Sequence, residues 1–320
     1  MRGFPRLLAA VLACAVLAGC TGGTGARSRA AGVAAPAALA GYYAQKLHWT
    51  ACDNGFECAR LLVPFEYSRP GWKRFSLPVI KLPAADPRQR IGSLVVNPGG
   101  PGGSGVQYAK SARSVIAPAI LDRFDIVGFD PRGVGGSEPA VHCLTGPQLD
   151  KYYATDDTPD NAAQLARVVS ESELFARACA AQAGPLLPYV GTQNAARDLD
   201  VLRAALGDAK LTYLGKSYGT YLGAWYAQLF PRHVRALVLD GALNPDATAT
   251  EINLVQAEGF EVALHSFAAN CMAAPGCPLG HGHDVAAGIA KIQGLLNRAT
   301  ATPLANDLGD GRPADGALFN

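Results

Sequence analysis

A serine flanked by glycines at the spacing of a nucleophilic turn occurs in the stretch Gly215-Lys216-Ser217-Tyr218-Gly219. The apolar run 211–215 before it predicts a strand, and the stretch 218–230 after it predicts a helix. A sharp strand-to-helix turn leaves no room for side chains two residues before or after the serine, and it exposes Oγ at a helix N-terminus, where the helix dipole favours negative charge. We therefore predict that Ser217 is the nucleophile of an acyl-transfer reaction; an ordinary glycine-rich turn is the alternative.

A glycine-rich loop at residues 97–105 (Asn-Pro-Gly-Gly-Pro-Gly-Gly-Ser-Gly) follows an earlier predicted strand. Beside a nucleophile of this kind, such a loop supplies one backbone amide to the oxyanion, and the residue after the serine supplies the other. Pro101 has no N–H, so we assign the two donors to the amides of Gly100 and Tyr218. A phosphate-binding loop is the alternative, but the stretch lacks the Gly-Lys-Ser/Thr ending of such loops.

A third glycine-rich stretch, residues 130–137 (Asp-Pro-Arg-Gly-Val-Gly-Gly-Ser), also follows a predicted strand. Asp130 and Arg132 could be catalytic. Their position at a strand exit is more typical of a turn that side-chain hydrogen bonds hold in place, so we favour a structural role for both.

The elements that must position these residues alternate between strand and helix. A turn at 68–71 separates two apolar stretches, 59–67 and 74–82, which predicts an antiparallel hairpin. Further buried strands are predicted at 91–97, 124–130, 211–215 and 235–240, and helices at 105–121, 194–206 and 218–230. This alternation predicts an α/β fold with a mostly parallel, doubly wound sheet.

Two regions do not follow this alternation of strand and helix. Residues 139–190 predict an excursion above the sheet, and the chain from residue 246 onward predicts helices that begin a cap or lid. The expected organisation is a signal peptide at 1–19, a flexible tether at 20–45, a core at 46–245 and the start of a cap at 246–320. The 320 residues, 49% hydrophobic and 17% charged, suffice for one large core and exclude a disordered chain.

The N-terminus indicates export. Arg2 and Arg6 precede an apolar stretch, 7–17, that is too short to span a bilayer, and the stretch ends in a lipobox-like Leu-Ala-Gly-Cys at 17–20. We expect cleavage before Cys20 and lipidation of that cysteine, which would anchor the protein to the outer face of the cell membrane; an ordinary secretory signal is the alternative. Two of the 28 basic residues would leave with the signal, so that 26 remain against 26 acidic ones. This balance excludes a basic surface for nucleic acid.

Of the eight cysteines, Cys14 would leave with the signal and Cys20 would carry the lipid, so six remain in an oxidising compartment. Short closures favour Cys52 with Cys58, Cys143 with Cys179, and Cys271 with Cys277, although the sequence does not fix the connectivity. The alternative for the last pair is a zinc site with His281 and His283, but its spacing matches no common zinc finger.

Taken together, the motifs at 99–102, 130–137, 215–220 and 239–241 resemble those of the prolyl aminopeptidase-like serine peptidases, and within them the secreted tripeptidyl aminopeptidases of actinobacteria. The cysteine-containing stretches 52–64 and 271–280 also resemble that branch. The resemblance implies an α/β-hydrolase fold with a helical cap. It also implies release of short peptides from the free N-termini of peptide substrates or, as in relatives, hydrolysis of esters. It implies no metal or organic cofactor. We expect a monomer.

In this fold the catalytic acid and histidine follow the serine along the chain, after later strands. We find no strand pair beyond residue 246 that could carry them, so we expect the final strands and these two residues to be absent from this sequence. His233, His265, His281 and His283 are interpreted as surface or packing residues, and Asp240 as structural. An inactive envelope lipoprotein or a gene fragment is therefore a second hypothesis, beside an active peptidase or an envelope esterase.

Overall fold

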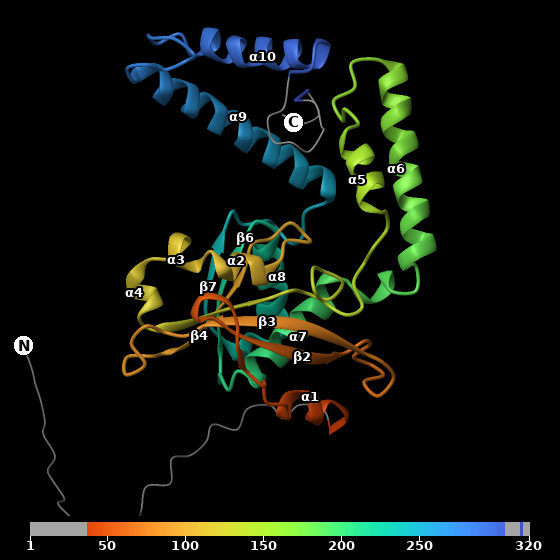
Figure 1. Cartoon of the computed structure of the whole chain (residues 1–320), viewed down its shortest axis with the longest axis vertical. Helices are drawn as coiled ribbons and strands as arrows, with labels where there is room; N and C mark the ends of the chain where they lie inside the picture. Colours follow the sequence, from red (N-terminus) through yellow and green to blue (C-terminus); the bar gives the residue numbers. More distant parts are fainter. Residues whose placement is uncertain (1–36, 305–313, 316–320) are drawn as a thin grey trace, which may run out of the picture. The chain divides into compact units, whose positions relative to one another are not determined.

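The computed structural model describes residues 37–304 and 314–315 (Figure 1). The predicted signal peptide and Cys20 lie outside the described residues. No described helix has the length and apolar character needed to cross a membrane.

In the described part of the chain, seven strands form one sheet in the order β1-β2-β3-β5-β4-β6-β7. Their bounds are β1 Thr50–Ala51, β2 Glu57–Pro64, β3 Arg74–Leu82, β4 Gly92–Asn97, β5 Phe124–Phe129, β6 Leu211–Lys216 and β7 Val234–Asp240. β2 and β3 pair antiparallel, β3 also runs antiparallel to β5, and the neighbouring strands from β5 to β7 are parallel. The predicted hairpin and mostly parallel sheet are confirmed.

The central strands are buried on both faces. Every residue of β4 and of β5 is buried, as their continuous apolar runs predict. Because side chains alternate along a strand, Val95 of β4 joins one core cluster, which includes Leu199 and Leu222, whereas Leu94 joins a second cluster, which includes Ala109. The two clusters belong to helices on opposite faces of the sheet, which is the doubly wound arrangement that the sequence predicts.

The described helices have the following bounds: η1 Ala37–Leu39, α1 Ala40–Ala44, η2 Asp53–Gly55, α2 Gly105–Lys110, α3 Ala112–Val115, α4 Pro118–Leu121, α5 Gly146–Tyr153, α6 Ala162–Ala183, η3 Leu187–Tyr189, α7 Thr192–Ala205, α8 Tyr218–Leu229, η4 Pro231–His233, α9 Ala249–Ala273 and α10 Val285–Ala301. The single helix predicted over 105–121 is wrong, because the chain forms three short helices there. The last break has a steric cause: Ala117 precedes Pro118 and is extended, with φ −59° and ψ 140°, as proline requires of the residue before it.

The predicted tether ends earlier than residue 45, because residues 37–44 are helical and join the core. The Tyr43 hydroxyl donates to Asp200 Oδ2 at 3.0 Å, and the Tyr42 hydroxyl donates to the carbonyl of Pro70 at 2.8 Å. The reason is the two tyrosines: their rings pack against the core cluster of α7 while each hydroxyl finds an acceptor. The stretch 20–36 lies outside the described residues.

Asp200 of α7 collects four donors. Besides Tyr43, its carboxylate accepts from Arg203 Nε at 2.7 Å and Tyr226 Oη at 2.9 Å, and it lies 2.8 Å from His233 Nδ1. Burial alone would raise the pKa of Asp200, but the hydrogen bonds from Arg203 and His233 hold it below its usual value. An ionised carboxylate therefore ties α1, α7, α8 and η4 together.

A buried ion pair joins the loop after β5 to α7. The fully buried guanidinium of Arg132 forms a two-pronged hydrogen-bonded pair with Asp198, with Nε 2.7 Å from Oδ2. Its remaining donors reach the carbonyls of Pro64, Phe65 and Tyr189. The hydroxyl of Tyr67 donates to Asp198 at 2.8 Å. The structural role predicted for Arg132 is thus explained by a buried charge whose five N–H donors all find acceptors inside the protein.

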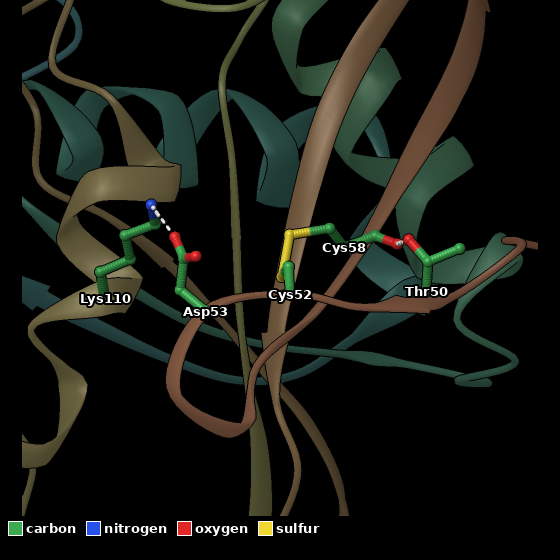
Figure 2. The surroundings of a disulfide bond; sticks show 5 residues. All are labelled: Thr50, Cys52, Asp53, Cys58 and Lys110. Atoms are coloured by element: carbon green, nitrogen blue, oxygen red, sulfur yellow. Dashed lines mark hydrogen bonds and ion pairs between the residues drawn. A yellow bond between two sulfur atoms is a disulfide. The ribbon is translucent and has the colours of Figure 1, made fainter.

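Three disulfides join Cys52 with Cys58, Cys143 with Cys179, and Cys271 with Cys277, which are the pairings favoured from the sequence. Figure 2 shows the first of them, near the point where Lys110 of α2 pairs with Asp53 at 3.2 Å. The second disulfide ties the loop before α5 to α6, and the third closes the turn after α9. Because Cys271 and Cys277 bond to each other, they are not zinc ligands, and the described residues contain no group of three or more metal-ligating side chains.

We predict that Asp198→Asn lowers the free energy of unfolding by about 3–5 kcal/mol, because it leaves the charge of Arg132 buried without a counter-ion. Urea unfolding followed by circular dichroism measures the loss. Glu173→Gln is the matched control, since it removes a carboxylate whose ion pair with Arg177 is exposed, and it should change the free energy by less than about 1 kcal/mol. An equal, small effect of both substitutions would contradict the role assigned to the pair.

Candidate active site

Ser217 lies at the bend between β6 and α8 with φ 52° and ψ −124°, a conformation that side-chain-bearing residues rarely adopt. Its side chain is exposed. The bend is held by its neighbours: the Ser217 amide donates to the carbonyl of Asp240 at 2.9 Å, and the Ser217 carbonyl accepts from the Thr220 amide at 2.8 Å and the Thr220 hydroxyl at 2.7 Å. Backbone strain of this kind persists only where the surroundings enforce it, and it gathers at functional sites.

The glycines on either side of the serine are required by close backbone contacts. A Cβ added at Gly215 would lie 2.3 Å from the carbonyl oxygen of Gly219, and one added at Gly219 would lie 2.9 Å from both oxygens of Asn97. The hydroxyl of Tyr213 also donates to the Gly219 carbonyl at 2.8 Å. Burial raises the pKa of this phenol, so that it remains a donor. The strand, the helix and the neighbouring strand β4 thus meet at a point where no side chain fits.

The loop after β4 packs directly against the bend. A Cβ at Gly99 would lie 2.4 Å from the carbonyl oxygen of Lys216 and 3.1 Å from Cβ of Ser217, and Gly99, Gly100 and Gly102 all have positive φ. The Gly99 amide donates to Asn97 Oδ1 at 2.9 Å, and the Gly103 amide donates to the Gly99 carbonyl at 3.1 Å. The structure therefore brings the glycine loop and Ser217 together. The Tyr218 amide is the first of α8 and has no carbonyl of its own helix to bond.

Asp130, which follows β5, connects the glycine loop after β4 to the loop after β5. Its Oδ1 accepts from the Ser104 hydroxyl at 2.6 Å and from the Val106 amide at 3.2 Å, while Oδ2 accepts from the Gly136 amide at 2.8 Å. Ser104 in turn caps α2 by accepting from the Gln107 amide at 3.0 Å. Asp130 is thus engaged with backbone and cap groups, in agreement with the structural role that its position predicts.

Charged and aromatic side chains flank the serine. Nζ of Lys216 lies 3.2 Å from Oδ2 of Asp240, and this hydrogen bond raises the pKa of Lys216. On the α8 side, the Tyr218 hydroxyl lies 2.7 Å from Oγ1 of Thr192, and the rings of Tyr218, Tyr221 and Trp225 follow one another along the helix. A pocket of about 360 Å³ opens between the start of α7 and this aromatic row. The pocket is lined by residues of α7, of α8 and of the segment before α7, and Ser217 is not among them.

No described histidine hydrogen-bonds to Ser217. His233 precedes β7 and is bonded to Asp200, at the opposite end of the strand from the serine, because β6 and β7 are parallel with Lys216 opposite Asp240. His265 lies exposed on α9 beside Glu261 at 3.1 Å, and His281 and His283 lie in the exposed turn before α10. Asp240 contacts the serine through its backbone and Lys216 through its side chain. None of these residues is placed as a general base for Ser217 in the described part of the chain.

The sequence points to Ser217, Asp130 and Arg132, but it does not identify several polar groups of α7 that hold the surrounding elements. The Asp198 carboxylate, the Asp200 carboxylate and the Thr192 hydroxyl were not singled out, although all three lie on α7. One signal was present: two aspartates two residues apart within an amphipathic helical stretch place carboxylates on two different sides of one helix.

A family model described as the alpha/beta hydrolase fold matches residues 92–281, more than half of the chain. The chain belongs to this family. The resemblance predicted from the motifs is thereby confirmed, and the match includes the loop at Gly99, the bend at Ser217 and the start of the predicted cap.

Three similar proteins carry names more specific than that of the family. The chain is 42% identical over 275 residues to the serine protease Hip1 of Mycobacterium tuberculosis, a match that covers 83% of this chain and 51% of the relative. It is 40% identical over 243 residues to the tripeptidyl aminopeptidase of Streptomyces coelicolor (72% and 44%), and 41% identical over 248 residues to carboxylesterase B of M. tuberculosis (77% and 47%). The chain spans about half the length of the curated relatives it matches.

We predict that Gly215→Ala lowers the free energy of unfolding by about 1–3 kcal/mol, because the added methyl group would overlap the Gly219 carbonyl and the Tyr213 ring. Gly259→Ala is the matched control: it adds the same methyl group in the exposed interior of α9, where nothing lies within 4 Å, and should stabilise the helix by up to about 1 kcal/mol. Urea unfolding of both variants is the measurement. Equal behaviour of the two would show that the bend tolerates a side chain and would contradict the contact described above.

Proposed function

We propose that this protein is an exported serine hydrolase that forms an acyl-enzyme on Ser217 and releases short peptides from free N-termini. The observation that carries the proposal is the exposed Ser217 hydroxyl at positive φ, with the backbone of Gly99 packed against it. The names of the serine protease and tripeptidyl aminopeptidase relatives support a peptide substrate.

In the proposed mechanism, Ser217 Oγ attacks the scissile carbonyl carbon while a general base takes its proton. We assign the base to none of the described histidines. The carbonyl oxygen becomes negative and accepts hydrogen bonds from the backbone amides of Gly100 and Tyr218. The tetrahedral intermediate then collapses, the C–N bond breaks, and the leaving amine takes a proton. Water hydrolyses the acyl-enzyme and restores Ser217.

The positive end of α8 adds to this stabilisation. Tyr218 is the first residue of the helix, so its amide has no carbonyl of the same helix to bond and lies next to Ser217. The contacts around the bend hold the Ser217 backbone at positive φ, and a bend fixed in this way would keep the donors in place as charge develops. Such preorganisation is what an acyl-transfer site requires.

Export is supported by the three disulfides, which persist in oxidising compartments, and by the predicted signal at 1–19. Lipidation of Cys20 and attachment to the outer face of the membrane belong to the same proposal. Cleavage at that point would leave the described residues, from 37 onward, outside the cell membrane.

A second candidate function is hydrolysis of envelope esters. The carboxylesterase B relative, 41% identical over 77% of this chain, favours it, and the acyl-enzyme chemistry is the same for an ester. The two candidates differ in whether the site recognises the free amino group of a peptide.

We predict that a fluorophosphonate probe labels the protein when its general base is present and that Ser217→Ala abolishes the labelling, because the probe reports a serine hydroxyl that is activated at an oxyanion site. Ser170→Ala is the matched control; this serine lies exposed on α6, and the variant should label like the wild type. Labelling is followed by gel fluorescence and by mass spectrometry of the modified peptide. Labelling that persists in Ser217→Ala would contradict the nucleophile assignment, and so would absence of labelling in a longer version of the chain that carries a histidine after later strands.

We further predict that a tripeptide phosphonate with a free N-terminus labels Ser217 faster than its N-acetylated counterpart, because an aminopeptidase site must bind an ammonium group. The rate of labelling at fixed probe concentration is the measurement, and a simple alkyl fluorophosphonate normalises for the reactivity of the serine. Equal rates for the free and the acetylated tripeptide would favour the esterase candidate over the peptidase.

A further inference from the structure

The turn that joins β2 to β3 carries an exposed aromatic and cationic tip, which we define as residues 69–74 (Arg-Pro-Gly-Trp-Lys-Arg). Trp72 is 46% exposed, and Arg69, Gly71, Lys73 and Arg74 are exposed as well. A large aromatic ring surrounded by cations on a projecting turn is unusual for a surface that meets only water.

The ring of Trp72 is held in place. Its edge packs on Phe65 at 5.5 Å and on Tyr189 at 5.9 Å between ring centroids, and the Arg69 guanidinium and the Lys73 ammonium lie 4.7 and 5.0 Å from its own centroid. These contacts fix the ring while leaving about half of it uncovered. The tip is therefore preformed and needs little ordering before it meets a partner.

The charge of the tip is only partly balanced. Glu66 pairs with Arg69 at 2.6 Å, whereas Lys73 and Arg74 form no ion pair with a carboxylate of the described residues. Residues 20–52 contain three basic residues and no acidic one, whereas Asp53, Glu57 and Glu66 follow before the tip. The Tyr42 hydroxyl bonds to the Pro70 carbonyl at 2.8 Å, so the N-terminal segment enters the core beside the tip (Figure 1).

The tip also projects from a defined side of the sheet. Val79 of β3 lies opposite Phe129, the last residue of β5, so the antiparallel strand β3 extends from Pro78 back to Arg74 beyond the carboxyl ends of the parallel strands. Ser217 follows β6 at that same edge. The turn also lies beside α1, through the Tyr42 bond to Pro70, and its residues Glu66 and Ser68 line a pocket with Phe230.

From these observations we propose that residues 69–74 dock the protein on an anionic lipid surface, with Trp72 at the headgroup level and Lys73 and Arg74 against lipid phosphates. Tryptophan is enriched where bilayers meet water, and Lys and Arg near an anionic bilayer each add to the affinity. This contact is distinct from lipidation of Cys20 and does not depend on the hydrolase activity.

The test uses the chain from residue 20 onward with Cys20→Ala, so that neither the apolar signal peptide nor a cysteine to receive the lipid is present. Sedimentation with vesicles of equal parts phosphatidylglycerol and phosphatidylcholine measures binding. We expect the additional pair Lys73→Glu and Arg74→Glu to weaken binding by about tenfold or more, because two attractive charges become repulsive. The control pair Arg88→Glu and Arg167→Glu makes the same change in net charge at exposed positions of the loop before β4 and of α6, and should weaken binding less than about threefold.

Trp72 gives an independent readout. Brominated lipid in the same vesicles should quench tryptophan fluorescence, and Trp72→Phe should remove most of that quenching, whereas Trp225→Phe, which changes a half-buried residue of α8, should preserve it. Lys73→Gln and Arg74→Gln remove the two charges without reversing them, and this pair replaces the charge reversal if the reversal disturbs the start of β3. Circular dichroism verifies the folding of each variant.

Three results would overturn the proposal: no binding of the Cys20→Ala chain to the anionic vesicles, equal binding to vesicles of phosphatidylcholine alone, or equal weakening by the tip and control pairs. Complete release from the vesicles by a soluble polyanion such as polyphosphate, together with unchanged quenching in Trp72→Phe, would point to a soluble anionic polymer instead and would also overturn it.

Discussion

The site depends on one steric constraint, which is that three backbone segments approach one another without side chains between them. Gly215 meets Gly219 across the bend, Gly219 meets Asn97 of β4, and Gly99 meets the carbonyl of Lys216. These contacts leave Ser217 no alternative to the positive φ that it adopts. A side chain at any of the three glycines would separate the segments, so the exposure of the hydroxyl and its closeness to the glycine loop follow from the same packing.

Around this point, carboxylates connect elements that the sheet alone would not fix. Asp130 binds the loop after β4 to the loop after β5, Asp198 binds Arg132 to α7, and Asp200 binds α7 to α8 and to the segment before β1. Each carboxylate is buried and accepts from several donors. Removal of one partner would leave a charge or donors unsatisfied in the interior, which explains why polar residues persist in so apolar a core.

The sequence predicts the sheet well because its central strands are continuous apolar runs, and burial on both faces leaves them no other role. It predicts the bend because the spacing of glycines around Ser217 has a steric meaning. The sequence does not reveal contacts between residues that are far apart along the chain. Arg132 and Asp198 are 66 residues apart, and nothing near either one reveals the other. A local signal also limits the prediction over 105–121, because Pro118 keeps Ala117 extended and so divides the helix there.

The N-terminal segment shows how a compositional interpretation can miss packing. Gly, Ala and Ser dominate the stretch before residue 40, and this composition predicts a tether. Tyr42 and Tyr43 reverse that prediction for residues 37–44, because each tyrosine buries a ring and bonds a fixed acceptor, one at the turn between β2 and β3 and one on α7. The place where the chain enters the core is thus set beside residues 69–74. Tyr42 and Tyr43 thereby connect that turn to α7 and, through Asp200, to His233 before the amino end of β7.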